Sequence, residues 1–477
     1  MKRYLLVLAI CGLAAAQPVF TGAAIFPPEE FASRRARVME KIGDGAAIVL
    51  GATEPPGEMP LRQGNQFFYV SGVVEPRAIL VIDGKSKRST LFLNPRNVQR
   101  ESSMYGPGLS PGEDAAKATG IDAVLPRSDF QAMVDSFSSE GRAIYTPFRP
   151  EVLGSISSGD PDRLWAANKS DPWDGRTSRE QAFIAHLQER APNCDVRNLD
   201  PILDAMRGIK SPREIAVIRE ATRIAGLGIM EAMRDAQPGM FEYELQADSE
   251  FVFKKYGAFG AAYFALIGAG PNTYYTHYHG NTAKLQDGDL VQFDYAPDYK
   301  YYQSDVTRVF PVNSKFTPRE REYYDIYLRL YRAVMTSIKV HAFPRDVIKD
   351  AVVKMDGIMA GYKFADDKIK IAAQKFVENY RRQEARATSL GHSVGMEVHD
   401  VRMPTDTLEP GEIFTIEPEM RIEEDHLGMR LEDMLLITET GYENLSSFVP
   451  IEIADIEKLM ADRKHGLSAA HSTLPGK

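Results

Sequence analysis

Two ten-residue segments of the chain, 285–294 and 408–417, are near copies of one another. In both, a leucine, a glycine, an acid, an aliphatic residue and a large apolar residue occupy matching positions. The first segment ends in Asp294 and the second in Glu417. If the two halves pack face to face, these carboxylates meet, and clustered carboxylates repel unless a cation neutralises them. The duplication therefore indicates a metal site.

Histidines and further acids repeat with the two segments. His277 lies 17 residues before the first terminal acid, and His399 lies 18 residues before the second. Asp305 follows the first terminal acid by 11 residues, and Glu432 follows the second by 15. These four residues are candidates for the same centre.

The first segment continues into a predicted hairpin, with strands at 289–297 and 301–312. A tight turn at Tyr299 and Lys300 would set Asp294 directly opposite Asp305, with Cβ atoms about 5 Å apart. Opposed acids destabilise a bare sheet, and the apolar residues around them indicate a half-buried sheet. Metal ligation therefore explains this pair better than a solvated acidic surface does.

Three candidate ligands, one of them a further histidine, lie in the second half. His392 stands between small residues that leave an imidazole accessible, and Glu417 ends an apolar strand before Pro418, which stops strand pairing. Glu432 lies in a strand too apolar for a surface acid. With the two aspartates, four carboxylates and one imidazole suit Mn²⁺, Co²⁺ or Zn²⁺, and bridging carboxylates allow two ions. Two ions about 3.5–4 Å apart generate a bridging hydroxide and polarise a carbonyl, as hydrolysis requires.

A second catalytic motif overlaps this pattern. Residues 391–395 match G-x-S-x-G, in which Ser393 would be the nucleophile of a serine hydrolase. That motif needs a helix directly after it, and an Asp and a His downstream. The residues after Ser393 do not resemble the start of a helix, so this interpretation is the weaker one.

Composition is that of an ordinary soluble globular protein. At 477 residues the chain is long enough for two domains, and its hydrophobic content of 44% is ordinary for a globular protein. A net charge of -9 and the lack of a long basic run argue against nucleic acid as a partner.

The N-terminus resembles a secretory signal peptide, which we expect to cover residues 1–16. A basic start precedes an apolar run of about 12 residues, too short to span a membrane, and three alanines supply a cleavage site. We therefore expect a secreted or periplasmic protein without a membrane span. Cleavage would leave Cys194 as the lone cysteine, which excludes an internal disulfide.

The N-terminal half is predicted to be an α/β domain over residues 26–205. Short apolar runs bounded by turn residues predict strands, and Ser155 to Thr177, rich in Gly, Pro, Ser and Asp, is predicted to be irregular. The predicted strands are 45–50, 67–71, 78–82 and 90–93, and the predicted helices are 31–42 and 110–119.

The C-terminal half, residues 206–460, is predicted to be α+β with internal pseudo-two-fold symmetry, followed by a polar tail at 461–477. Ser211 and Thr317 each begin a capping box with proline at the first helical position. Two helical pairs alternate with two antiparallel strand pairs. The predicted helices are 212–236, 241–256, 318–340 and 344–361, and the second strand pair is 412–420 with 428–438.

The acidic pattern, with its local sequences, resembles the pita-bread metallopeptidases, which include aminopeptidase P, prolidase and methionine aminopeptidase. The N-terminal half resembles the creatinase-type domain of the first two, on the strength of Arg62-Gln63, Phe67, Tyr69 and Ser71-Gly72. The resemblance covers residues 26–460. The sequences that carry it in the second half are DGDLVQFDYA at 287–296, SDVTRVFPV at 304–312, GHSVGMEVHD at 391–400, TIEP at 415–418 and RLED at 430–433.

The resemblance implies roles for individual residues. Asp294 would hold one ion, His392 and Glu417 the other, and Asp305 and Glu432 would bridge the two. Glu417 would also move the proton of the attacking water. The resemblance implies that His277 contacts the scissile region, that His399 stabilises the tetrahedral intermediate, and that Arg430 supports the ligands.

Three features depart from the family pattern: Thr388, Glu419 and the short loop from His399 to Pro410, which contains Arg402. Thr388 stands where the family motif His-Gly-Leu-Gly-His has its first histidine, which contacts substrate. Glu419 replaces the glycine of the usual Glu-Pro-Gly. Arg402 could pair with a substrate carboxylate, as a dipeptidase requires, or lie in solvent.

We therefore expect a dinuclear metallopeptidase, with Mn²⁺ favoured over Co²⁺ or Zn²⁺. A hydroxide that bridges the metals would hydrolyse the bond between an N-terminal residue and a following proline. A prolidase that cleaves only Xaa-Pro dipeptides is the main alternative, and a non-catalytic peptide-binding module is another. The family's habit suggests a homodimer or homotetramer.

Overall fold

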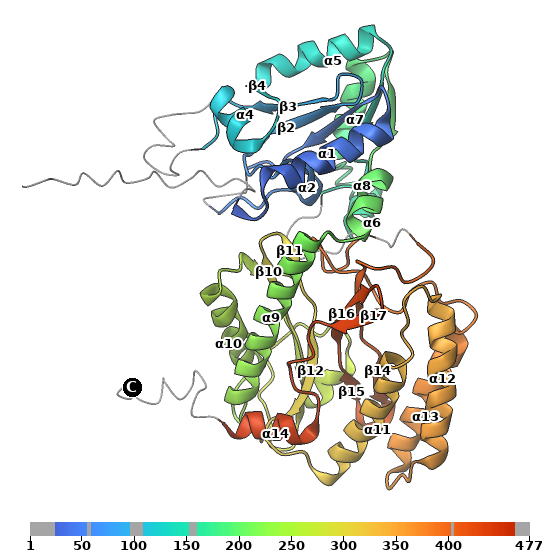
Figure 1. Cartoon of the computed structure of the whole chain (residues 1–477). Helices are drawn as coiled ribbons and strands as arrows, with labels where there is room; N and C mark the ends of the chain where they lie inside the picture. The colour runs from blue at the N-terminus through green and yellow to red at the C-terminus, as the bar shows by residue number, and fades with distance from the viewer. Residues whose placement is uncertain (1–23, 55–58, 96–107, 152–159, 402–404, 463–477) are drawn as a thin grey trace, which may run out of the picture. The chain divides into compact units, whose positions relative to one another are not determined.

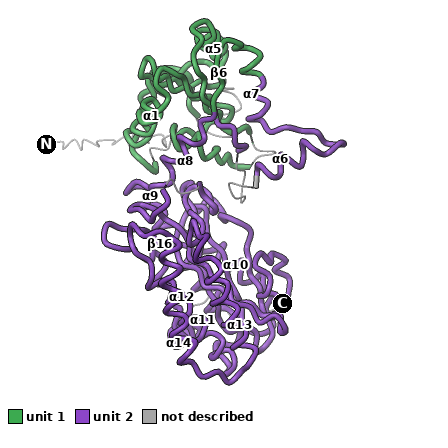
Figure 2. The backbone as a smooth tube through the Cα atoms, turned by 90° about the vertical axis from the view of Figure 1, so that its right-hand side faces the viewer, with its two compact units in different colours: residues 1–146, 186–197 green, residues 147–185, 198–477 purple. Residues whose placement is uncertain are grey.

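The structure of the chain is a computed structural model that describes residues 24–54, 59–95, 108–151, 160–401 and 405–462 (Figure 1). The predicted signal peptide, Arg402 and nearly all of the polar tail lie outside these residues. The chain divides into two compact units (Figure 2). Unit 1 comprises residues up to Thr146 with His186–Arg197, and unit 2 comprises Pro147–Ala185 with the residues from Asn198 onward. The domain boundary near residue 205 stays a prediction.

Unit 1 is built on a six-stranded mixed sheet in the order β4-β3-β2-β1-β5-β6. The central strand β1 runs antiparallel to β2 and parallel to β5, and β1 and β2 are almost wholly buried. This arrangement confirms three of the four predicted strands. The strands are β1 (Ala46–Leu50), β2 (Ile79–Asp83), β3 (Arg88–Leu93), β4 (Ala123–Pro126), β5 (Ala143–Thr146) and β6 (Asp195–Asn198).

The fourth predicted strand, 67–71, is wrong, because these residues belong to the helix α2 (Asn65–Ser71). Aromatic and β-branched residues favour strands only weakly, and tertiary packing overrides that preference. The ring of Phe68 packs edge-on against Phe31, at 5.8 Å between centroids. Gly72 then ends the helix in the left-handed conformation (φ 66°), and its N–H donates to the carbonyl of Phe68 at 2.8 Å.

The irregular segment predicted for 155–177 is also partly wrong, because α6 (Asp160–Ser170) crosses it. Its proline stands in the first turn, where no intrahelical N–H is needed. The remaining helices that precede the second half are α1 (Pro28–Ile42), α4 (Glu113–Thr119), α5 (Phe130–Ser139), α7 (Arg179–Arg190) and α8 (Asp200–Gly208).

Long helices in unit 2 flank a central group of strands (Figure 1). Both predicted capping boxes form: the side chain of Ser211 accepts from the N–H of Glu214, and that of Thr317 accepts from the N–H of Glu320. No helix among the described residues is long and apolar enough to cross a membrane. The helices are α9 (Pro212–Asp235), α10 (Glu242–Lys255), α11 (Pro318–Met335), α12 (Pro344–Gly361), α13 (Asp367–Gln383) and α14 (Ile453–Ala461).

The strands of unit 2 repeat one pattern in each half, which confirms the α+β prediction with its internal symmetry. In each half a strand ends just before or at an acid, a short hairpin follows, and a second strand returns beside the first. The strands are β7 (Gly260–Ala261), β8 (Leu266–Ala269), β9 (Leu290–Asp294), β10 (Pro297–Tyr299), β11 (Tyr302–Gln303), β12 (Thr307–Pro311), β13 (Ile413–Ile416), β14 (Glu419–Ile422), β15 (Leu427–Arg430), β16 (Asp433–Thr438) and β17 (Gly441–Asn444).

The predicted register of the first hairpin is wrong by one turn position. The turn lies at Lys300 and Tyr301, which both have positive φ (52° and 72°), the geometry of the two-residue turns that match strand twist. Asp294 therefore faces Thr307 rather than Asp305. Neither turn residue is a glycine or an asparagine, so the sequence lacked the usual signal for this turn.

Candidate metal centre

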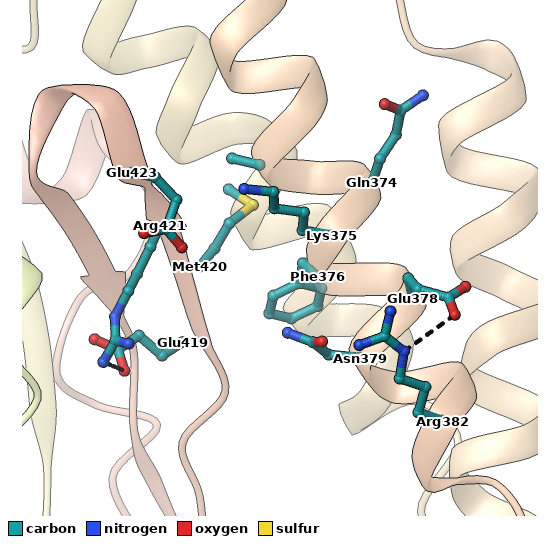
Figure 3. Close-up of a pocket in the computed structure, with 11 residues that line it drawn as sticks. Gln374, Lys375, Phe376, Glu378, Asn379, Arg382, Glu419, Met420, Arg421 and Glu423 are labelled. Atoms are coloured by element: carbon teal, nitrogen blue, oxygen red, sulfur yellow. Dashed lines mark hydrogen bonds and ion pairs between the residues drawn. The ribbon is translucent and has the colours of Figure 1, made fainter.

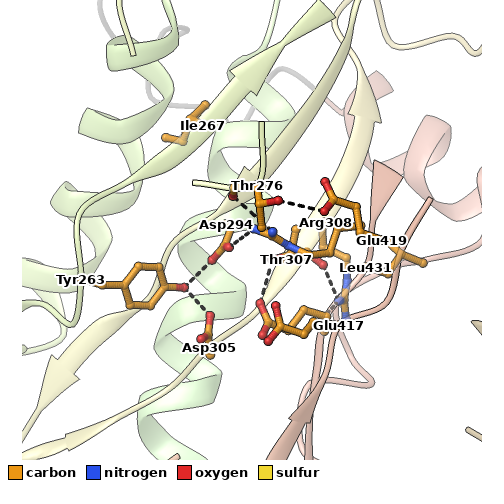
Figure 4. A network of polar contacts seen from close by, with 12 residues as sticks. Tyr263, Ile267, Thr276, Asp294, Asp305, Thr307, Arg308, Glu417, Glu419 and Leu431 are labelled. Atoms are coloured by element: carbon orange, nitrogen blue, oxygen red, sulfur yellow. Dashed lines mark hydrogen bonds and ion pairs between the residues drawn. The ribbon is translucent and has the colours of Figure 1, made fainter. Parts of the chain in front are cut away.

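The candidate ligands lie where the strands of unit 2 end. Asp294 is the last residue of β9, and Asp305 lies between β11 and β12. Glu417 lies between β13 and β14, and Glu432 between β15 and β16. A backbone bridge between Thr307 and Glu432 joins the two halves at this point. The duplicated strands therefore bring the acids of both halves to one place (Figure 4).

His392 completes this group. Its Nε2 lies 3.2 Å from Glu417 Oε1, 3.4 Å from Asp305 Oδ2 and 3.9 Å from Glu432 Oε1. Ligand atoms of Asp305, His392 and Glu432 all lie within 4.8 Å of one another, close enough to hold one ion. The other imidazole nitrogen, Nδ1, lies 3.3 Å from the carbonyl of Ser393, which directs Nε2 toward the acids.

Burial and neighbouring charges shift the pKa values of the candidate ligands. Burial and the charge of Asp305 raise the pKa of Asp294 to about 7. Burial and the neighbouring carboxylates raise the pKa of Glu432 well above its usual range. At His392 burial is outweighed, because hydrogen bonds to Asp305 and Glu417 raise its pKa to about 10. Burial and mutual repulsion thus disfavour the ionised forms of Asp294 and Glu432 unless positive charge compensates them.

Tyr263, which the sequence did not single out, joins two of the acids. Its hydroxyl lies 2.6 Å from Asp294 Oδ1 and 2.6 Å from Asp305 Oδ1 (Figure 4). A hydroxyl has one proton, so it can donate to only one of them, and the other contact needs a protonated carboxyl. The surrounding residues, Ala-Ala-Tyr-Phe, carry no motif that could have indicated this role.

Two more side chains fix the acids. The guanidinium of Arg430 pairs with Asp294 and donates to the carbonyl of Thr276 at 3.2 Å. These contacts join Arg430 to one candidate ligand, and its supporting role stays a prediction. Thr307, which was missed, donates its hydroxyl to Glu432 Oε2 at 2.7 Å. Glu432 Oε1 is buried and accepts no hydrogen bond from the residues that the structure describes.

The residues present fit divalent cations. The side chains of Asp294, Asp305 and Glu432 are at most 7% exposed, whereas that of Glu417 is 32% exposed. Buried carboxylates that face one another are unfavourable unless positive charge compensates them. The oxygen-rich donor set with one imidazole, and the hydrogen-bond vacancy at Glu432, are what a metal site requires.

The two other predicted histidines differ in their surroundings. The ring of His399 lies 4.1 Å from that of His392, and the residue is half-buried. His277 follows the 3-10 helix η4 (Gly270–Tyr274) and is exposed. Burial and the charge of His392 lower the pKa of His399, and the charge of His277 adds to this effect. The ring of His399 therefore lies next to the candidate ligand His392.

Glu419, which replaces the glycine of the family sequence, makes polar contacts beside the centre. Glu419 Oε2 accepts from Arg421 at 2.6 Å and from the hydroxyl of Thr276 at 2.9 Å. Glu419 and Arg421 line a cavity of about 640 Å³ between β14 and α13, which Figure 3 shows. Lys375 on α13 also lines this cavity and is exposed. Thr388, the other departure, is exposed as well.

The serine hydrolase interpretation is wrong. No helix follows Ser393 in the described stretch up to Val401, and its backbone instead bridges to Phe414. The strand-to-helix turn that presents a nucleophilic serine is therefore missing at this position.

Two family models match the chain: Aminopeptidase P, N-terminal domain, over residues 31–145, and Metallopeptidase family M24 over residues 216–439. Xaa-Pro aminopeptidase of Escherichia coli (strain K12) is 33% identical over 460 residues, which cover 91% of this chain and 97% of that protein. The chain belongs to metallopeptidase family M24. All five candidate ligands of this M24 metallopeptidase lie within the matched range, and the family implies divalent metal ions.

Other M24 relatives and solved structures agree. Xaa-Pro aminopeptidase 3 of Homo sapiens is 29% identical, covering 83% of this chain and 76% of that protein. Aminopeptidase P of E. coli with the inhibitor Pro-Leu has a TM-score of 0.70 at 28% identity, covering 92% of this chain and 99% of that one. Proline aminopeptidase P II of Yersinia pestis has a TM-score of 0.69 at 31% identity, covering 91% and 99%. The predicted family and fold class are confirmed.

Proposed function

We propose that the chain is a Xaa-Pro aminopeptidase, which hydrolyses the bond between an N-terminal residue and a following proline. One observation carries the proposal: four carboxylates and His392 converge on a buried centre in a chain that aligns over 91% of its length with a Xaa-Pro aminopeptidase. Hydrolysis that depends on two metal ions gives a role to every carboxylate of the acidic group.

The five ligands suit two ions, for which we favour Mn²⁺ because oxygen donors dominate the set. Asp294 would hold one ion, and His392 and Glu417 the other, with Asp305 and Glu432 shared between them. Ions bound there would supply an acidified water and a polarised scissile carbonyl.

The chain's own groups then handle protons and charge. Glu417 is the most exposed of the four carboxylates, and hydrogen bonding to His392 outweighs burial to lower its pKa. It is therefore ionised and open to solvent, as a group that accepts a proton from the attacking water must be. His399 and His277 donate hydrogen bonds to the carbonyl oxygen as negative charge develops on it.

A prolidase is the second candidate, and the cavity beside Glu419 favours it. Arg421 and Lys375 line that cavity, and a cation there suits the free carboxylate of a dipeptide. Arg421 is already paired with Glu419, which weakens this attraction. We therefore rank the aminopeptidase first.

A panel of peptides separates the two candidates. The metal-reconstituted protein is assayed on Xaa-Pro, Xaa-Pro-Xaa and Xaa-Ala-Xaa peptides. An aminopeptidase cleaves Xaa-Pro-Xaa and leaves the alanine peptide nearly intact. Cleavage of the dipeptide alone identifies a prolidase, and equal cleavage of the alanine peptide contradicts proline specificity.

We also propose that the protein is secreted or periplasmic and forms a homodimer or homotetramer. The basic start, apolar run and alanine-rich site at residues 1–16 support export. N-terminal sequencing of the native protein tests the cleavage after Ala16, and sedimentation measures the assembly.

A further inference from the structure

One loop carries both His392 and His399. Residues 391–401 contain no helix, so contacts other than a helical backbone must hold the two imidazoles in place. Two backbone hydrogen bonds close the loop on itself: the N–H of Asp400 donates to the carbonyl of Ser393 at 2.8 Å, and that of Gly395 donates to Glu397 at 3.1 Å. These bonds fix the backbone on both sides of His399.

The two acids that flank His399 are bound to buried cations. Arg207, in the last turn of α8, donates to Glu397 Oε1 at 3.0 Å and to Asp400 Oδ1 at 2.5 Å. Lys210 lies just beyond this helix, and its Nζ is 3.3 Å from Asp400 Oδ2. All four side chains are at most 2% exposed. We call Arg207, Lys210, Glu397 and Asp400 the four-charge cluster.

The charges of the cluster balance, two positive against two negative. Burial opposes ionisation of Asp400, but the charges of Arg207 and Lys210 outweigh it and lower its pKa. Removing one member would leave an unpaired buried charge, which is strongly unfavourable. The cluster therefore has one stable arrangement, and that arrangement fixes the loop.

Close packing leaves the loop little room to shift. A Cβ on Gly395 would collide with the carboxylate of Asp400, so only glycine fits there. The carbonyl of Gly395 accepts from the N–H of Gln303 at 2.7 Å, in the hairpin strand that precedes Asp305. The loop is thus tied to the cluster on one side and to a ligand-bearing hairpin on the other.

We propose that the four-charge cluster is a positioning device that holds the imidazole of His399 at the metal centre. Its members touch no substrate; they act through the backbone on either side of His399, whose ring lies 4.1 Å from that of His392. The proposal rests on the proposed function, in which His399 contacts the substrate.

A double-mutant cycle with kcat as the measured quantity tests the positioning role of the four-charge cluster. Asp400→Asn keeps the shape of the side chain and removes its charge. We expect it to lower kcat by about 10- to 100-fold with the bound metal retained, because such supporting contacts have effects of that size. In the His399→Ala background the same change should alter kcat by less than about twofold, since its target is gone. Asp83→Asn, which removes the same charge from the Arg142 pair in unit 1, is the matched control and should leave kcat unchanged.

Equal loss of kcat in both backgrounds, no loss in either, or loss of bound metal from Asp400→Asn would overturn the proposal. If Asp400→Asn does not fold, Glu397→Gln carries the same cycle, because it leaves the Arg207–Asp400 pair intact. If the wild-type protein cleaves none of the peptides, the proposed function fails, and the cluster is tested without turnover by ¹H–¹⁵N histidine spectra. A shifted His399 ring signal in the variant then supports the positioning role, and an unchanged signal contradicts it.

Discussion

At the scale of single residues, the four candidate carboxylate ligands could be predicted because each is an acid in or next to an apolar strand sequence, whereas His392 was indicated by the small residues around it and by the family sequence. Asp305 and Glu432 are buried at the ends of strands, where an uncompensated charge is costly. Tyr263 lies in no motif, and Thr307 lies in a family sequence but is neither an acid nor a histidine, so the sequence predicted no role for either residue. Their roles come from contacts between segments 31 to 125 residues apart.

The contacts of Tyr263 predict a functional effect. Tyr263→Phe removes the hydroxyl that holds Asp294 and Asp305, so we expect metal affinity or kcat to fall by about 10- to 100-fold while the fold persists. Metal titration and steady-state kinetics measure the two effects. Tyr295→Phe is the matched control, because the Tyr295 hydroxyl donates to Glu250 at 2.7 Å and not to a carboxylate of the candidate ligands. Unchanged values in Tyr263→Phe would show that the hydroxyl has no role.

At the scale of elements, the sequence predicted helices correctly where a strong local signal, such as a capping box, marks the start of the helix. Capping boxes located the starts of α9 and α11, and α12 has its predicted bounds. α13 was missed although Asp366 caps it, because no proline or capping box marks its start. The hairpin register depended on a turn without glycine, and α2 depended on packing against α1, so neither followed from local sequence.

Arg308 joins the two strand pairs and predicts an effect on stability. It is fully buried and donates to Asp433 Oδ1 at 2.7 Å and to the carbonyl of Glu432 at 2.7 Å. Arg308→Met leaves the Asp433 carboxylate without its cation, so the free energy of unfolding should fall by about 3–5 kcal/mol. Urea unfolding measures this, and adding Asp433→Leu should recover part of the loss. A change below about 1 kcal/mol in Arg308→Met would contradict the role.

At the scale of the whole molecule, the duplication brings the charges of both halves to one buried centre. The family match spans both units, 31–145 and 216–439, and the relatives align along nearly the whole chain. Length predicted two domains, but the compact units interleave at residues 147–197, where the sequence indicated only an irregular stretch rich in Gly, Pro, Ser and Asp. The electrostatic repulsion among these buried carboxylates therefore arises from the packing of both halves and not from any one segment.

The repulsion among these buried groups predicts how the stability of the fold depends on pH when metal is absent. The pKa of Asp294 is raised from 3.8 to about 7, so its stabilising contribution is present at low pH and is lost as pH rises toward 7. The pKa of His392 is raised from 6.5 to about 10, so its contribution is complete below 6.5 and is lost as pH rises toward 10. The chelated protein should therefore melt several degrees lower at about pH 8.5 than at about pH 5.5. A Tm that rises over this window would contradict the assignment, and added Mn²⁺ should raise the Tm most at the higher pH.

The most direct test of a metal-dependent Xaa-Pro aminopeptidase is kcat/KM for one Xaa-Pro-Xaa peptide before chelation, after chelation and after Mn²⁺ is restored, with Xaa-Ala-Xaa measured alongside. We predict that chelation abolishes cleavage of the proline peptide, that Mn²⁺ restores it, and that the alanine peptide is cleaved at least about 100-fold more slowly, a difference of about 2.7 kcal/mol in transition-state binding. Cleavage that survives chelation, or equal cleavage of the two peptides, would contradict the account.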